Sequence, residues 1–218
     1  MHAQIVLYDG FDPLDVIAPF EVLAAGSDAA GGDLAVELVS AEGARDVVSG
    51  TRGLSLAAGG RLDPAKPGYV LVPGASGPIA GDPDDGVATI PVLLARASQS
   101  ALTPLLREAL DNPAVTVATV CGGSMVLAMA GLIEGRHAVT HHLGVDLLEA
   151  TGVRAVRARV VDDGDLISGG GVTSGLDLAL YLVERSYGPR IAHAVEELFE
   201  YERRGTVWKP AGREPMEL

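Results

Sequence analysis

The chain of 218 residues is long enough for one domain with a sizeable hydrophobic core. Its formal net charge of −13 argues against nucleic acid or an anionic membrane surface as the main partner. A single cysteine excludes an internal disulfide framework and fits a reducing compartment. The first residues lack the character of a signal peptide, and no apolar run reaches the roughly 18 residues that span a bilayer. We therefore expect one soluble, cytoplasmic domain over residues 1–218, with residues 205–218 as a C-terminal tail and a small molecule as its substrate.

The N-terminal segment predicts a strand followed by a helix. Residues 3–8 are apolar enough for a short buried strand. Asp12 followed by Pro13 is typical of a helix start, where aspartate caps the free N–H groups and proline needs no hydrogen bond. We expect this helix to run over residues 13–24, with a kink at Pro19.

Two carboxylates of this helix are candidate acids. Asp15 lies in the first turn, where a negative charge complements the helix dipole, and that role alone would explain it. However, a helix that follows the first strand of a parallel sheet begins at the edge where ligands bind, so Asp15 is also a candidate site residue. Glu21 is the second candidate acid, although six residues place it about 240° around the helix from Asp15.

The next elements lead to a glycine loop. Residues 34–40 alternate as a strand, residues 47–56 are typical of a small hairpin, and residues 69–72 form another buried strand. The loop after that strand contains Gly74 and Ala75, whose backbone N–H groups are candidate donors to a polar intermediate. An ordinary strand-to-helix turn would explain the loop equally well.

The only cysteine lies between a predicted strand and a predicted helix. After helical material in residues 83–111, broken near residue 100, residues 115–120 form a β-branched buried strand. Cys121 follows directly, and then come Gly122 and Gly123. A sharp strand-to-helix turn lifts such a side chain to the sheet edge, and the helix N-terminus favours its thiolate. We interpret Cys121 as a nucleophile, the alternative being a small buried hydrophobic residue.

Two adjacent histidines follow a short predicted strand at residues 137–140. Neighbouring side chains of a strand point in opposite directions, and no cysteine or glutamate cluster accompanies His141 and His142. The pattern therefore predicts no metal site. At the end of its strand, His141 remains a candidate for lining the pocket.

The C-terminal part contains a second junction of strand, glycines and helix. We expect its elements at 145–150 (helix), 154–161 (strand), 166–168 (strand), 176–187 (helix) and 190–203 (helix). The triple glycine of residues 169–171 could suggest a phosphate-binding loop, but it lacks the Gly-Lys-Ser/Thr of such loops. We instead expect the backbone of Gly171 and Val172 to lie close to Cys121. The glutamates of the last helix predict a solvated face.

Together these junctions resemble the ThiJ/PfpI superfamily over residues 3–187. The motifs that carry the resemblance are residues 14–23, 72–74, 120–124, 130–132, 139–141 and 168–177. The resemblance implies a flavodoxin-like three-layer α/β/α sandwich with a mainly parallel sheet, related to class-I glutamine amidotransferases. It also implies a homodimer, without a cofactor.

Within this superfamily the chain is most similar to the isonitrile hydratase branch. That branch implies Cys121 as nucleophile and Asp15 as its assisting acid, with a covalent thioimidate hydrolysed to an N-substituted formamide. The cysteine of that branch is typically followed by threonine, whereas this chain has Gly122. The alternatives are a glyoxalase- or deglycase-like activity on reactive carbonyls, and a non-catalytic domain that senses a small molecule or redox state.

Overall fold

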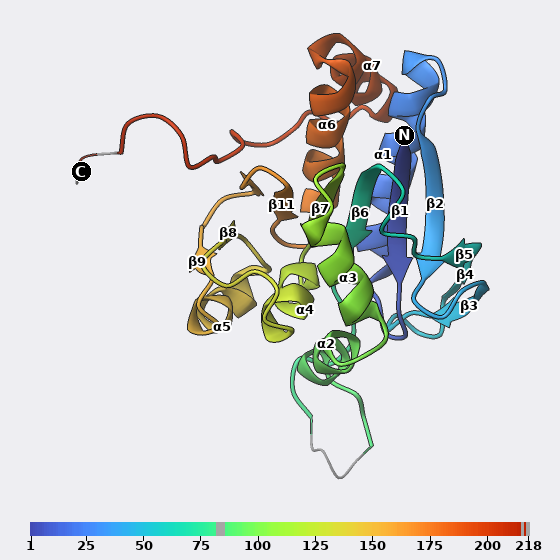
Figure 1. Cartoon of the computed structure of the whole chain (residues 1–218), viewed down its shortest axis with the longest axis vertical. Coiled ribbons are helices and arrows are strands. Elements are labelled where there is room, and N and C mark those ends of the chain that lie inside the picture. The colour runs from blue at the N-terminus through green and yellow to red at the C-terminus, as the bar shows by residue number, and fades with distance from the viewer. Residues whose placement is uncertain (82–85, 215, 217–218) are drawn as a thin grey trace.

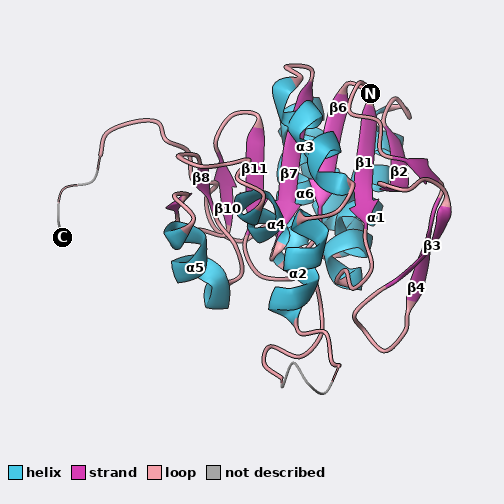
Figure 2. Ribbon diagram, turned by 60° about the horizontal axis from the view of Figure 1, so that its bottom comes forward, coloured by secondary structure: helices cyan, strands magenta, loops and turns pink. Residues whose placement is uncertain are grey.

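The computed structural model describes residues 1–81, 86–214 and 216, which form a central sheet between two groups of helices (Figures 1 and 2). The strand order is β10-β11-β7-β6-β1-β2-β5. All neighbouring strands are parallel except β10 and β11. The strands are β1 (His2–Leu7), β2 (Ala35–Ser40), β5 (Gly60–Arg61), β6 (Gly68–Val72), β7 (Val115–Val120), β10 (Val160–Asp162) and β11 (Leu166–Gly169). The predicted α/β sandwich is confirmed.

The helices cover the sheet in two groups, α1, α6 and α7 against one another and α2 with α3 and α4. Their bounds are α1 (Pro13–Ala30), α2 (Ile90–Ser98), α3 (Leu102–Asp111), α4 (Gly123–Met129), α5 (Val145–Ala150), α6 (Ser174–Tyr187) and α7 (Pro189–Phe199), with a short 3-10 helix at His142–Gly144. Helices α1 and α6 approach closely at Gly26, where a Cβ atom would lie 2.5 Å from Val183 Cγ2. No helix of the described chain is both long enough and apolar enough to cross a bilayer.

Short strands extend the domain at both sides of the sheet. The predicted hairpin is β3 (Arg45–Val48) paired with β4 (Ser55–Ala58), beside the β2 edge (Figure 2). At the other side, β8 (His137–Ala138) pairs with β9 (Arg154–Ala155). The segment after α7 returns to the β10 edge, where the Trp208 N–H donates to the Val160 carbonyl at 3.0 Å.

Several predicted bounds differ from the structure. Helix α1 continues beyond residue 24 to Ala30 and ends at Gly31, which adopts a left-handed φ of 109°. The last helix stops at Phe199 because Glu200 also takes a left-handed conformation.

Further differences concern the shorter elements. The strand predicted at 154–161 divides into β9 and β10, and the one at 137–140 covers only His137–Ala138. Residues 83–85 of the predicted helical stretch lie outside the described residues. The expected break in that stretch falls between α2 and α3.

Candidate active site

The strand-to-helix turn after β7 holds Cys121 in a strained backbone conformation. Its φ is 53°, in the left-handed region that non-glycine residues rarely adopt. Neighbouring polar groups hold this conformation. The Cys121 N–H is shared between the carbonyls of Gly169 (3.1 Å) and Gly170 (2.7 Å), and the Cys121 carbonyl accepts from Thr140 Oγ1 at 2.8 Å. The sharp turn predicted at the cysteine is therefore present, and β11 and the segment after β8 hold it in place.

Glycines allow the turn to pack directly against the loop that follows β6. A Cβ atom at Gly123 would lie 2.1 Å from the Val72 carbonyl oxygen. A Cβ atom at Gly74 would lie 2.6 Å from the Gly122 nitrogen and 2.9 Å from Asp15 Oδ2. Since real Cβ atoms do not approach backbone so closely, a side chain at either position would force the neighbouring backbone to shift. Gly74 thus lies between Asp15 and the turn that carries the cysteine.

Asp15 is a fully buried carboxyl group at the start of α1. Its Oδ2 accepts a hydrogen bond from the Gly74 N–H at 2.9 Å, whereas Oδ1 has no partner among the described residues. Burial raises the pKa of Asp15 well above that of an ordinary carboxyl, and the negative charge of Asp12 adds to this effect. The Gly74 N–H opposes the shift. The net effect favours the protonated form of this carboxyl group over a wider pH range than for an exposed aspartate.

The Cys121 thiol is also held in its neutral form. Only 7% of the residue is exposed, and this burial raises its pKa, with the charges of Asp15 and Asp12 as further causes. The backbone N–H groups of Gly122 and Val172 act in the opposite direction. The expectation that the helix end would favour a thiolate is thus not met, because α4 has only seven residues and desolvation outweighs its effect.

An apolar cavity of about 360 Å³ opens onto the thiol. Its polar side chains include Asp12 and His141, and its walls come mainly from α2, α4, the 3-10 helix and the loop after β6. The apolar lining includes Ile79, Ile90, Leu94, Met125, Met129, Leu143 and Leu147. Burial lowers the pKa of His141, and so does the charge of His142, so the imidazole is neutral at neutral pH. The cavity therefore suits a small, uncharged and largely apolar group.

Five of the predicted site residues line this cavity, namely Ala75, Cys121, Gly122, His141 and Val172. They come from segments far apart in the sequence, and the parallel sheet brings them to one edge.

Four predicted residues lie outside the lining of this cavity. One is Asp15, which is buried against Gly74. The Gly74 N–H donates to Asp15 and so is not a free donor for an intermediate. Glu21 is exposed on α1 and outside the cavity lining, because its angular offset from Asp15 turns it towards solvent. Gly171 lies behind His141, where a Cβ atom would be 3.1 Å from the ring carbon Cδ2.

Tyr8 is a neighbour of the site that sequence reasoning missed. Its hydroxyl donates to the Pro73 carbonyl at 2.9 Å. Burial raises its pKa, and the charges of Asp15 and Cys121 raise it further. The one available signal was its position at the end of the first predicted strand. Tyr8 fixes the backbone of the loop that holds Gly74.

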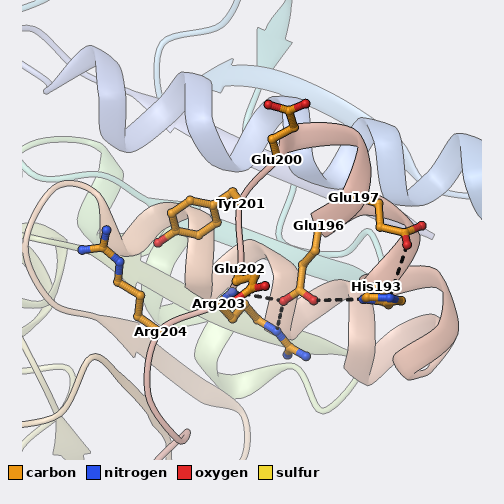
Figure 3. Close-up of a pocket in the computed structure, with 8 residues that line it drawn as sticks. All are labelled: His193, Glu196, Glu197, Glu200, Tyr201, Glu202, Arg203 and Arg204. Atoms are coloured by element: carbon orange, nitrogen blue, oxygen red, sulfur yellow. Dashed lines mark hydrogen bonds and ion pairs between the residues drawn. The ribbon is translucent and has the colours of Figure 1, made fainter.

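A separate hollow of about 610 Å³ runs along α7 and the segment after it (Figure 3). Its charged groups pair with one another, since Arg203 Nε donates to Glu196 Oε1 at 2.9 Å and His193 faces Glu196 and Glu197. Across the described residues, no group of three or more His, Cys, Asp or Glu side chains is placed to hold a metal ion.

The fold and site define a class of α/β sandwich proteins with a cysteine at a strand-to-helix turn and a buried carboxylic acid beside it. Residues 94–185 match the family described as the DJ-1/PfpI family. The chain belongs to this family, also called ThiJ/PfpI, and the predicted resemblance is confirmed.

Three relatives illustrate the likeness. Isonitrile hydratase of Pseudomonas putida is 46% identical over 85 residues, which are 39% of this chain and 37% of that protein. The HTH-type transcriptional regulator CdhR of Pseudomonas aeruginosa is 33% identical over 164 residues, 74% of this chain and 44% of the regulator. The matches thus span less than half the length of both proteins. The crystal structure of a ThiJ/PfpI family protein from Pseudomonas syringae has a TM-score of 0.74 at 23% identity, covering 94% of this chain and 76% of the other, which shows the fold.

Proposed function

We propose that this protein is a cysteine-dependent hydratase that adds water to a small isonitrile, R–N≡C, and releases an N-substituted formamide. One observation carries the proposal. The buried carboxylic acid of Asp15 lies beside the thiol-bearing turn, with Oδ1 unpartnered among the described residues. The identity with isonitrile hydratase, although partial, supports the same reaction.

The first step joins the thiol to the isonitrile carbon. That carbon carries a lone pair and is also electrophilic once protonated, so it needs an acid and a nucleophile together. Asp15 gives its proton to the carbon, Sγ of Cys121 attacks the same carbon, and the thiol proton passes to the Asp15 carboxylate. One C–H and one C–S bond form, one π bond of the N≡C group breaks, and the thioimidate R–N=CH–S–Cys121 results.

The second step hydrolyses this adduct. Water adds across the C=N bond, with its oxygen on carbon and a proton on nitrogen. The C–S bond then breaks, the hydroxyl proton returns to sulfur, and R–NH–CHO leaves. The backbone N–H groups of Gly122 and Val172, which favour negative charge on Sγ, stabilise the departing thiolate.

The raised pKa values of Cys121 and Asp15 suit this chemistry. A permanent thiolate would react with any electrophile that reached it, whereas a neutral thiol beside a neutral acid reacts only when a substrate accepts the acid's proton. A neutral isonitrile fits the apolar cavity, which has no cationic side chain among its described lining residues.

A second candidate function is a small-molecule sensor. The similarity to the regulator CdhR covers 74% of this chain, and this breadth favours a ligand-binding role. In that case the cavity would bind a ligand, and Cys121 would not turn it over.

A panel assay with purified protein tests the proposal. Formamide formation from aryl and alkyl isonitriles is followed by proton NMR, beside consumption of methylglyoxal, for the wild type, Cys121→Ala and Asp15→Asn. We expect formamide from the wild type alone. Methylglyoxal consumption without formamide would indicate a carbonyl enzyme, and ligand binding without either reaction would indicate a sensor.

A further inference from the structure

A second cavity adjoins the one at Cys121. It has a volume of about 550 Å³, and Thr140 and Val172 line both cavities. Its lining also includes Arg157, Arg159 and Thr173. The two cavities therefore share one wall, and the Val172 N–H in that wall favours negative charge on Sγ.

The second cavity differs from the first in its charge. Arg157 and Arg159 line it, in a chain whose formal net charge is −13. Asp12, the carboxylate of the first cavity, is not among its described lining residues. The lining also includes Thr173, the N-cap residue of α6. The dipole of this helix of 14 residues adds to the positive potential. An anion is the ligand that this side of the wall attracts.

The two arginine side chains differ in how firmly the protein holds them. Arg159 is held by the protein, because Nε donates to the buried Asp177 at 2.6 Å and Nη2 donates to Thr173 Oγ1 at 3.0 Å. Arg157 has one ion pair among the described residues, to Asp146 at 3.2 Å, and the two side chains are 71% and 94% exposed. Such an exposed pair is worth at most about 1 kcal/mol, so a ligand carboxylate replaces Asp146 at little cost.

We propose that the second cavity is a subsite for a carboxylate on the substrate, with Arg157 as the residue that selects it. This inference rests on the proposed hydratase function and narrows its substrate class. The substrate becomes an isonitrile whose N-bearing carbon also carries a carboxylate and an apolar side group. The isonitrile carbon meets Sγ, the side group enters the cavity of Met125 and Leu94, and the carboxylate lies on the Arg157 side of Val172. The product is then an N-formyl amino acid.

Product binding tests the subsite without any turnover. N-formyl-leucine and its methyl ester differ in the charge of the carboxyl group and in one methyl group, and isothermal titration calorimetry measures both on the wild type. We expect the acid to bind about tenfold more tightly, since a charge-assisted hydrogen bond is lost in the ester. Arg157→Gln removes the preference, and Arg157→Lys keeps part of it.

Arg154→Gln is the matched control. Arg154 is exposed in β9, three residues away, and does not line the second cavity. We expect it to keep the preference for the acid, so a loss in Arg157→Gln alone reports the subsite rather than the net charge of the chain.

The outcomes separate this inference from the proposed function. Equal binding of acid and ester, no measurable binding of either, or a preference that survives in Arg157→Gln overturns the carboxylate subsite, even when neutral isonitriles are hydrated. A preference for the acid that depends on Arg157 supports the subsite. If hydration of isonitrile acids and neutral isonitriles then fails, the proposed function falls and the anion subsite stands.

Discussion

Replacing Gly74 by alanine tests whether Asp15 and the cysteine turn meet as closely as the structure indicates. The new Cβ atom would lie 2.6 Å from the Gly122 nitrogen, 3.1 Å from Gly122 Cα and 2.9 Å from Asp15 Oδ2. Two of these neighbours are backbone atoms that cannot rotate away. Overpacking of this kind costs about 1–3 kcal/mol in the free energy of unfolding. The same shift moves the acid away from the thiol, so we expect hydration to fall at least as steeply as stability.

Urea denaturation measures the cost as a lower midpoint with an unchanged slope. Gly60→Ala is the control, because no atom lies within 4 Å of the new Cβ position and Gly60 does not have a left-handed φ. We expect the control to stay within about 0.5 kcal/mol of the wild type. Equal midpoints for the two variants would refute the close contact between the loop after β6 and the cysteine turn.

The remaining predictions concern the acid, the thiol and the residue after it. Asp15→Asn keeps an acceptor for the Gly74 N–H but loses the acid, so kcat falls about 10²- to 10⁴-fold in the formamide assay with little change in the circular dichroism spectrum. Burial raises the pKa of Asp15 in the folded state, so the stability it contributes is complete below its ordinary value of about 3.8 and is lost as the pH rises through the folded pKa. Asp15→Asn should therefore gain stability relative to the wild type above about pH 4 in urea titrations, and a constant difference between the two proteins would contradict the raised pKa. Because burial raises the pKa of Cys121, its alkylation by iodoacetamide at pH 7.4, measured by mass spectrometry, is at least about tenfold slower than that of free cysteine. Gly122→Thr brings a Cβ atom 3.0 Å from Leu94 Cδ2, so it destabilises the protein by about 1 kcal/mol alone and by less in combination with Leu94→Ala, and additive effects in this double-mutant cycle would argue against the contact.

The fold was predictable because its signals are local and repeated. Buried β-branched runs such as Val115–Val120 fix the strands, and glycine-rich junctions at one sheet edge fix where the site lies. Asp15 and Cys121 were both selected as candidates in this way, since each follows a parallel strand. The division of the strand predicted at 154–161 was not visible, because its turn depends on pairing with β8 and β11.

The electrostatics of the site depend on burial, which the sequence alone does not show. The helix position of Cys121 predicted a lowered pKa, but desolvation reverses the sign. The sequence already placed Glu21 on a different helix face from Asp15, and in the structure Glu21 is exposed and outside the cavity lining. No sequence motif marked Arg157 and Arg159. They line the second cavity together with Val172 only because the segment between β9 and β10 folds back towards it. The homodimer and the cytoplasmic location stay predictions.

The central claim is that Cys121 forms a covalent bond to the isonitrile carbon with Asp15 as the acid. Acid-quenched samples taken during turnover, analysed by intact-protein mass spectrometry, test it most directly. We expect an added mass equal to that of the isonitrile, located at Cys121 by peptide mapping, absent from Cys121→Ala and strongly reduced in Asp15→Asn. Formamide production by Cys121→Ala at the wild-type rate, with no adduct in any sample, would contradict the account.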